Sequence, residues 1–430
     1  RPGRTGCAAA VDLGTTTVVA RLYDLAAGTE LQTCSGWNAQ APYGADVISR
    51  IQYTLEQPDG LPELSRRIRE QIWALVSDAL ARSGHTPGTL REITLAGNTV
   101  MQHLFAGYSV RGIAAAPFRP ETLFAAPGDE TLHGVPVHFA PCVAGYVGGD
   151  ITAGLLAAGL AELPVENLFL DIGTNGELCL GCKEYLLMGA GAAGPALEGF
   201  GSRYGMRAEE GAIRHLKMGE DGVFRLDVIG GGKPKGICGT GIFDLVAECY
   251  RYGIINGDGS VNMDRPQYVT RVWDENAQES LPAVVYGRNG DEKLYFTQRD
   301  IQEFVRCKAA GFTMVATLLD YCGLSLSDVG KFYLAGGFGT HIDLESAITV
   351  GLYPDVEREK LVPLGNTSLQ GAKKLLLDTS CLKRLDWFRK NGIYLHFSEM
   401  ETFPRNMVAA NFIPHTDARL YPSVKRKSLP

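Results

Sequence analysis

The chain has 430 residues, of which 45% are hydrophobic, and this length exceeds what a single hydrophobic core usually supports. Two lobes or two domains are therefore expected. The 41 basic and 48 acidic residues give a net charge of −7, which argues against a nucleic-acid binder that works by neutralising phosphates. No apolar stretch reaches the roughly 18 residues of a membrane span, so the sequence predicts a cytoplasmic protein that binds no membrane.

The ten cysteines are scattered, mostly within apolar segments, which favours reduced thiols in a core over a disulfide framework. Only Cys179 and Cys182 are closely spaced, and one such pair without a second is a weak indication of a metal site. The chain begins without a methionine, in a loop-like stretch directly before a strand. We therefore expect it to be a fragment of a longer polypeptide.

The first predicted element is a hairpin. An apolar run at 8–11 enters Asp12-Leu-Gly-Thr-Thr-Thr17, and the chain leaves through a second apolar run at 18–22. Apolar residues with helical spacing predict an amphipathic helix over 61–81, and a short strand at 93–96 follows it. This alternation of strand and helix is typical of an α/β fold.

A second hairpin repeats the pattern of the first. The segment 148–160 is rich in alanine, glycine and leucine, which predicts a tightly packed helix, and a strand at 168–170 then enters Asp171-Ile-Gly-Thr-Asn-Gly-Glu177. This is the one internal repeat of the sequence. Two similar lobes, each opening with the same hairpin, would account for it.

Later in the chain, Thr297 and Asp300 have the spacing of a capping box, which predicts a long helix that ends near Gly323. A strand at 332–335 follows and runs into the glycine-rich Gly336–Gly339. The region after residue 376 indicates no particular chemistry.

An aspartate at the end of a strand, followed by glycine and threonine, indicates phosphate chemistry, because backbone N–H groups and hydroxyls can hold an anion there. Magnesium takes only one or two carboxylates and keeps several waters, so Asp12 and Asp171 from opposing lobes would suffice to bind it. For either copy alone, an ordinary hairpin turn is the better explanation of the residues.

The two hairpins together with the later glycine loop resemble the actin, sugar-kinase and Hsp70 (ASKHA) superfamily, a two-lobed α/β fold built on a duplicated ribonuclease H-like unit. The resemblance implies a first lobe at 1–163, a second lobe at 164–430, and connecting helices at 144–160 and 344–352. It also implies that ATP contacts both phosphate loops and the glycine loop. Lys308, on the preceding helix, is a candidate contact to the base or ribose, although a surface lysine explains this residue better. The expected contact residues are Gly14, Thr15, Thr16, Thr17, Gly173, Thr174, Asn175, Gly176, Lys308, Gly336, Gly337, Phe338 and Gly339.

Further motifs narrow the resemblance to the reductive activators of corrinoid proteins. That family carries a ferredoxin-like [2Fe–2S] domain and a middle domain before its ATPase domain, and we expect both to lie outside this chain. Two departures from the family pattern, at Asn38-Ala-Gln40 and Gly189-Ala-Gly191, do not touch the phosphate loops. The motifs are Tyr43-Gly-Ala-Asp-Val-Ile-Ser-Arg50, Ala96-Gly-Asn-Thr-Val-Met-Gln-His103, Ala192-Ala-Gly-Pro-Ala-Leu-Glu-Gly199, Gly205-Met-Arg-Ala208 and Gly236-Ile-Cys-Gly-Thr-Gly241.

The family resemblance implies an ATPase that drives the reduction of a Co(II) corrinoid protein of a methyltransferase system to Co(I), with the electron supplied through the ferredoxin-like domain. Asp12 and Asp171 would hold magnesium, and Glu198 is a candidate to position the attacking water. The resemblance is compatible with a homodimer. A small-molecule kinase and an ATP-dependent chaperone or reactivase of a cobalamin enzyme remain as alternative functions.

Overall fold

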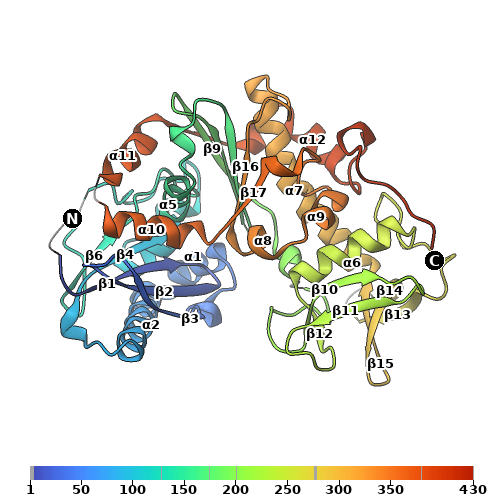
Figure 1. Cartoon of the computed structure of the whole chain (residues 1–430), viewed down its shortest axis with the longest axis horizontal. Coiled ribbons are helices and arrows are strands. Elements are labelled where there is room, and N and C mark those ends of the chain that lie inside the picture. Colours follow the sequence, from blue (N-terminus) through green and yellow to red (C-terminus); the bar gives the residue numbers. More distant parts are fainter. Residues whose placement is uncertain are drawn as a thin grey trace. The chain divides into compact units, whose positions relative to one another are not determined.

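A computed structural model of the chain describes residues 4–126, 128–173, 175–199, 201–275, 278–378 and 380–429, without the side chains of Ala192, Pro195 and Phe338. The chain forms two compact units, whose elements are labelled in Figure 1. Unit 1 comprises Arg1–Phe169, Cys179–Ala190 and Leu364–Leu395, and unit 2 comprises Leu170–Leu178, Gly191–Pro363 and His396–Pro430.

This division differs from the continuous lobes 1–163 and 164–430 because the chain returns to unit 1 after Pro363. Helix α10 (Thr367–Leu377) packs against helix α5 (Gly149–Ala158) and against strands β1 (Cys7–Leu13) and β4 (Leu90–Gly97). In Figure 1, the orange-red α10 lies beside the dark blue β1. Unit 1 is therefore completed by a helix from late in the sequence.

The sheet of unit 1 has the strand order β3-β2-β1-β4-β6-β5. Strand β1 pairs antiparallel with β2 and parallel with β4, and the first five residues of β1 are all buried. A strand that is covered on both faces reads as a continuous apolar run, which is why 8–11 has no polar alternation. The hairpin predicted around Asp12 is confirmed. The remaining strands are β2 (Thr17–Asp24), β3 (Glu30–Trp37), β5 (Thr131–Leu132) and β6 (Val135–Phe139).

Helix α2 (Gly60–Arg82) confirms the amphipathic helix predicted over 61–81. It packs against β2 and β3, and it buries one apolar residue per turn along the face that includes Leu64, Ile68 and Ile72. The other helices of this unit are α1 (Val47–Glu56), α3 (Thr99–Ala106), α4 (Arg111–Ala114) and α11 (Cys381–Asn391).

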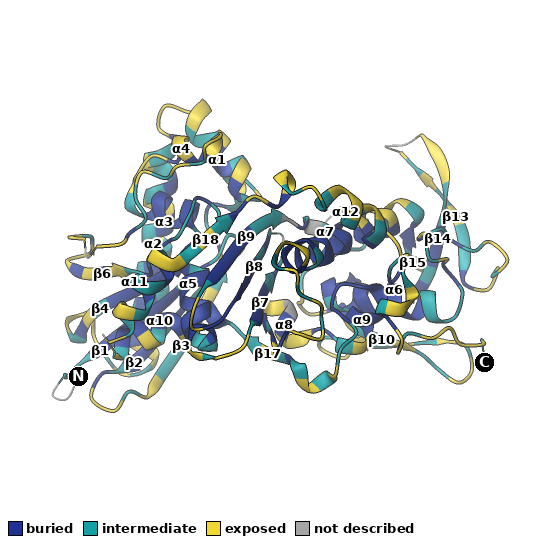
Figure 2. Cartoon of the chain, turned by 90° about the horizontal axis from the view of Figure 1, so that it is seen from above, coloured by how far each residue is buried: buried dark blue, intermediate teal, exposed yellow. Residues whose placement is uncertain are grey.

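A second six-stranded sheet has the order β17-β16-β7-β8-β9-β18. Its strands β7 and β8 are mostly buried, as their dark blue colour in Figure 2 shows. Together with the turn between them, they form the second hairpin, which contains Asp171. The strands are β7 (Asn167–Ile172), β8 (Asn175–Gly181), β9 (Leu186–Ala192), β16 (Phe332–Ala335), β17 (Leu361–Gly365) and β18 (Gly392–Leu395).

In unit 2, helix α7 (Gln298–Cys322) begins with the predicted capping box, in which the Thr297 and Asp300 side chains each bond the backbone of the other residue. Helix α7 packs against α12, and α6 packs against β10 and α9. The elements are β10 (Ala212–Met218), β11 (Phe224–Val228), β12 (Gly236–Ile237), α6 (Gly239–Arg251), β13 (Val269–Asp274), β14 (Glu279–Asn289), β15 (Glu292–Thr297), α8 (Gly336–His341), α9 (Leu344–Val350) and α12 (Phe403–Ala410).

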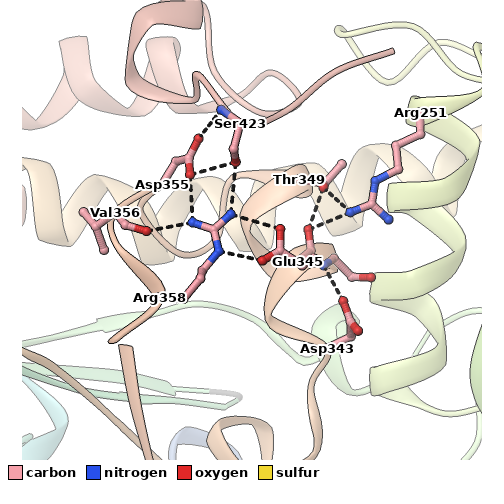
Figure 3. A network of polar contacts seen from close by, with 9 residues as sticks. Arg251, Asp343, Glu345, Thr349, Asp355, Val356, Arg358 and Ser423 are labelled. Atoms are coloured by element: carbon pink, nitrogen blue, oxygen red, sulfur yellow. Dashed lines mark hydrogen bonds and ion pairs between the residues drawn. The ribbon is translucent and has the colours of Figure 1, made fainter. Parts of the chain in front are cut away.

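A polar network centred on Arg358 fastens the C-terminal segment to unit 2 (Figure 3). The Arg358 guanidinium donates to Glu345 on α9, to Asp355 and to the hydroxyl of Ser423. Asp355 in turn accepts from the Ser423 backbone N–H and hydroxyl at 2.7 and 2.8 Å. Among the described residues, no helix is long and apolar enough to cross a membrane.

Candidate phosphate-binding loops

Asp12 lies in β1, directly before the turn of the first hairpin, and its carboxylate is held by the start of α10. Asn366 Nδ2 donates to Asp12 Oδ2 at 2.7 Å, and Ser368 Oγ donates to Asp12 Oδ1 at 2.8 Å. Burial raises the pKa of the Asp12 carboxyl, and the two hydrogen bonds act in the opposite direction because they favour the ionised form. Each oxygen still has lone-pair capacity for a further donor, such as a water bound to magnesium.

The backbone carbonyls of Gly14, Thr15 and Thr16, in the loop after Asp12, each accept a hydrogen bond. Asn38 donates its side-chain amide to Gly14 O at 2.8 Å and its backbone N–H to Thr16 O at 2.9 Å. The Arg50 guanidinium donates to Thr15 O at 2.6 Å. The family motif at 43–50 thus folds onto this loop. The segment 38–40 also contacts it, which contradicts the expectation that this departure from the family pattern does not touch the phosphate loops.

The planarity of the peptide bond fixes the direction of the N–H groups that follow these carbonyls. In a trans peptide the C=O of one residue and the N–H of the next point in opposite directions. The N–H groups of Thr15, Thr16 and Thr17 therefore point away from the Asn38 and Arg50 groups that hold the carbonyls. Backbone N–H groups in a loop are suited to bind an oxyanion, so these three groups are candidates to contact a phosphate.

The tripeptide Gly-Asn-Thr occurs twice, and both copies reach this loop. Asn98 caps α3 and donates to Thr15 Oγ1 at 3.0 Å, and Asn366 caps α10 and donates to Asp12. In both copies the side-chain oxygen accepts a backbone N–H in the first turn of the helix, which orients the amide nitrogen outward. The sequence reasoning missed Asn366 and Ser368, although the repeated tripeptide was a usable signal.

The second hairpin brings Asp171, Gly173 and Glu198 close together in unit 2. Asp171 is the penultimate residue of β7, and the turn is closed by a hydrogen bond from Gly173 N to Asn175 O at 2.8 Å. A Cβ placed on Gly173 would lie 3.4 Å from Glu198 Oε1, so the Glu198 carboxylate faces this turn. Thr174 lies outside the described residues.

Gly336, the first residue of the glycine-rich segment Gly336–Gly339, lies directly against the Asp171 carboxylate. A Cβ on Gly336 would lie 2.6 Å from Asp171 Oδ1, and the residue has a φ of 77°, which favours glycine. The segment Gly336–Gly339, expected as a loop, is instead the start of helix α8, so Gly337, Phe338 and Gly339 lie on a helical turn. Asn175 and Gly176 begin β8, with Gly176 packed against the Met314 side chain.

Lys308 contradicts the expectation that it contacts the base or ribose. It is fully buried, and its ammonium donates to the carbonyl oxygens of Ala410 at 2.5 Å, of Pro414 at 2.8 Å, and of Phe412. An ammonium has three N–H donors, and these carbonyls use all of them. Burial holds the pKa of Lys308 well below its usual value. The residue anchors the segment after α12.

The second connecting helix, expected at 344–352, is also placed differently. Helix α9 (Leu344–Val350) occupies the expected segment but packs against α6, whereas α10 packs against α5. The α5–α10 contact is close enough that a Cβ on Gly371 would strike the backbone of Ala153. Small residues allow the two helix backbones to approach each other, and the sequence shows them in both segments.

Within the described ranges, no group of three or more His, Cys, Asp or Glu side chains could hold a metal ion. Magnesium needs no such group, because one or two carboxylates and waters are enough. Cys179 lies in β8 and Cys182 directly follows that strand; both are buried and form no disulfide. Burial at a core strand fits inert thiols better than a metal site.

Two family models match the chain. Residues 166–425 match the model of the C-terminal domain of RACo, the ASKHA domain, and residues 7–163 match the model of the RACo middle region. The second match corrects two expectations: the middle domain is within this chain, and residues 7–163 are assigned to it and not to a first ASKHA lobe. The Asp12 loop thus lies in the middle-region match and the Asp171 loop in the ASKHA match.

Named proteins match the chain over most of its length. A solved structure of a reductive activator for corrinoid, iron-sulfur protein is 38% identical with a TM-score of 0.87, over 99% of this chain and 68% of that chain. The corrinoid activation enzyme RamQ of Eubacterium limosum is 35% identical over 381 residues, which are 86% of this chain and 64% of RamQ. The Co(II) methylated amine-specific corrinoid protein reductase of Methanosarcina barkeri is 25% identical over 415 residues, 87% of this chain and 70% of the reductase.

These matches confirm the α/β ASKHA fold class and the family resemblance drawn from the motifs. The chain spans 64% of the length of the Eubacterium limosum relative. With a family model covering residues 166–425 and a second covering 7–163, the chain belongs to the RACo family of reductive activators of corrinoid proteins.

Proposed function

We propose that this chain is the ATP-binding and ATP-hydrolysing part of an activator that drives the reduction of a Co(II) corrinoid protein to Co(I). Its family membership and the names of its relatives support the proposal. The observation that carries the nucleotide part is the first hairpin, where Asp12 is followed by three N–H groups that point away from the Asn38 and Arg50 groups bound to the loop carbonyls. The second hairpin, with Asp171 and Glu198 beside Gly173, offers the same kind of residues.

Both hairpins bind magnesium and phosphate. Asp12 and Asp171 hold magnesium and its waters, and magnesium bound there neutralises phosphate charge. The N–H groups and hydroxyls after Asp12, and Asn175 with Gly176 after Asp171, line the phosphates. Glu198 positions the attacking water. Gly337, on the first turn of α8, leaves space for the nucleoside, since a Cβ there would meet no atom within 4 Å, whereas Gly339 lies against the Leu334 backbone.

The hydrolysis is coupled to an electron transfer that is energetically uphill for common donors. The electron comes from a ferredoxin-like [2Fe–2S] domain of the whole protein, and the partner is the corrinoid protein of a methyltransferase system. A domain pair that binds ATP and releases ADP and phosphate can change its affinity for such a partner, because the nucleotide states favour different conformations.

The test is ATP hydrolysis by the chain with and without a Co(II) corrinoid protein. We expect slow hydrolysis alone, acceleration by the corrinoid protein, and loss of activity in Asp12→Ala and in Asp171→Ala measured separately. The separate variants matter because the two loops fall in different family matches. Acceleration by a sugar or a short-chain acid, with no response to any corrinoid protein, would establish a kinase instead.

A further inference from the structure

Arg50 is a buried cation whose recorded hydrogen bonds all end on neutral acceptors. Its side chain is 0% exposed, and the guanidinium donates to Gly44 O at 2.9 Å, Gln40 Oε1 at 3.3 Å, Met101 Sδ at 3.1 Å and Thr15 O at 2.6 Å. Such an arrangement is unusual, because buried charges in proteins are generally paired with an opposite charge.

The charge of Arg50 persists at neutral pH. Burial lowers its pKa to about 10, and the nearby Asp46 carboxylate, which caps α1 through Ser49, only partly opposes this shift. The guanidinium is therefore protonated, and its positive charge is incompletely balanced within the described residues. An anion bound close to it would supply the missing charge.

The peptide between Thr15 and Thr16 connects this charge to the candidate phosphate site. Arg50 binds the carbonyl side of that peptide, and the Thr16 N–H points from the opposite side. A carbonyl that accepts a charged hydrogen bond polarises its peptide, which makes the N–H a stronger donor. The Arg50 charge, bound to the Thr15 carbonyl, thus makes the Thr16 N–H a stronger hydrogen-bond donor.

We propose that Arg50 is a positioning residue for a nucleotide phosphate: it holds the Asp12 loop in shape through Thr15 and provides, through the Thr15–Thr16 peptide, part of the positive charge that attracts the phosphate. The inference rests on the proposed ATP site. It adds a charged residue, 0% exposed, that does not itself contact the ligand.

The test measures the affinity of ATP, ADP and AMP for the whole chain by titration calorimetry. Arg50→Gln is expected to bind ATP and ADP at least about tenfold more weakly, the lower range for a charged hydrogen bond. AMP, which lacks the outer phosphates, is expected to change by less than about twofold. Arg67→Gln is the matched control, since it removes the same charge from an exposed, Glu63-paired position in unit 1.

Three outcomes separate the possibilities. If the unmodified chain binds no ATP, the proposed function fails before Arg50 is in question. If it binds ATP and folded Arg50→Gln binds ATP equally well, only the role of Arg50 is overturned. If Arg50→Gln does not fold, Arg50→Lys decides: it keeps the charge, and a loss of the preference for ATP over AMP in that variant contradicts the proposal.

Discussion

The side-chain amide of Asn366 donates a 2.7 Å hydrogen bond to the carboxylate of Asp12, across 354 residues of sequence. Asn366 is the N-cap of α10, and the neighbouring Ser368 binds the other Asp12 oxygen. The orientation of the first candidate catalytic carboxylate is therefore set by the start of a helix that arrives late in the chain. This relationship makes α10 part of the site.

We predict that Asn366→Ala combined with Ser368→Ala shifts the acid limb of ATP hydrolysis to higher pH. Both bonds favour the ionised carboxylate, and burial already raises the pKa of Asp12, so their loss raises it further. A larger fraction of Asp12 is then protonated at a given acidic pH, so hydrolysis is expected to fall on the acid side of the profile and to recover as the pH rises. The measurement is a pH profile of the hydrolysis rate.

The control for this prediction is Asp343→Ala, which removes the N-cap of α9 through its bond to Ser346 in unit 2. It loses a comparable helix cap without touching Asp12. An unchanged pH profile in the double variant, or an equal shift in the control, would contradict the role given to Asn366 and Ser368.

We predict that Gly336→Ala impairs hydrolysis and lowers stability, whereas Gly337→Ala leaves stability unchanged. An alanine at 336 would place its Cβ 2.6 Å from Asp171 Oδ1 in a backbone conformation with φ of 77°. A Cβ at 337 meets no atom within 4 Å. The expected cost at Gly336 is about 1–3 kcal/mol, the usual range for overpacking or strain.

The measurement is the free energy of unfolding of both variants in denaturant, together with the hydrolysis rate of Gly336→Ala. Because the two glycines are adjacent, the comparison isolates the combined cost of the contact with Asp171 and of the positive φ at Gly336. Equal stabilities of the two variants would show that Asp171 does not lie against Gly336.

The parts of the fold that the sequence predicted are those with local signals. The hairpin at Asp12 follows from an apolar run and a glycine turn, and the start of α7 follows from the Thr297 and Asp300 capping box. Both depend on residues within a few positions of each other. Helical spacing likewise placed α2 to within one residue at each end.

The contacts that complete the site are not local, so no spacing rule finds them. Arg50 reaches Thr15, Asn366 reaches Asp12, and Lys308 binds carbonyls about a hundred residues later. A lysine four residues after an apolar helix position looks the same whether it faces a ligand or a backbone turn, and only the packing of α12 against α7 decides between them. The repeated Gly-Asn-Thr tripeptide is a local signal for two contacts of the site, because in both copies the asparagine follows a strand and caps the next helix.

We predict that Lys308→Met lowers stability without changing nucleotide affinity. The substitution leaves three carbonyl oxygens without their donor, two of them in buried hydrogen bonds and one in a part-buried hydrogen bond, at a cost of about 2–4 kcal/mol. Lys383→Met, at an exposed position on α11, is the control and is expected to change stability by less than about 0.5 kcal/mol. Denaturant unfolding and ATP titration check both; weaker ATP binding by folded Lys308→Met would restore the nucleotide role.

The tight contact between α5 and α10 leads to the last prediction, that Gly371→Ala both destabilises unit 1 and weakens hydrolysis. A Cβ at Gly371 would strike the Ala153 backbone, which cannot move as a flexible side chain can. Helix α10 must then shift away from α5, and Asn366 at its N-terminus shifts with it. We expect a loss of about 1–3 kcal/mol in the free energy of unfolding.

Two measurements distinguish this coupling from a general loss of stability. The hydrolysis rate is compared at a temperature where the variant is fully folded, and the pH profile is compared with that of the Asn366 and Ser368 double variant. Gly88→Ala, whose Cβ would meet only the Thr86 hydroxyl at 3.9 Å, provides the control. If folded Gly371→Ala hydrolyses ATP with the rate and pH profile of the unmodified chain, the position of α10 does not govern Asp12; a profile shifted toward higher pH shows that the helix contact acts on the carboxylate through its cap.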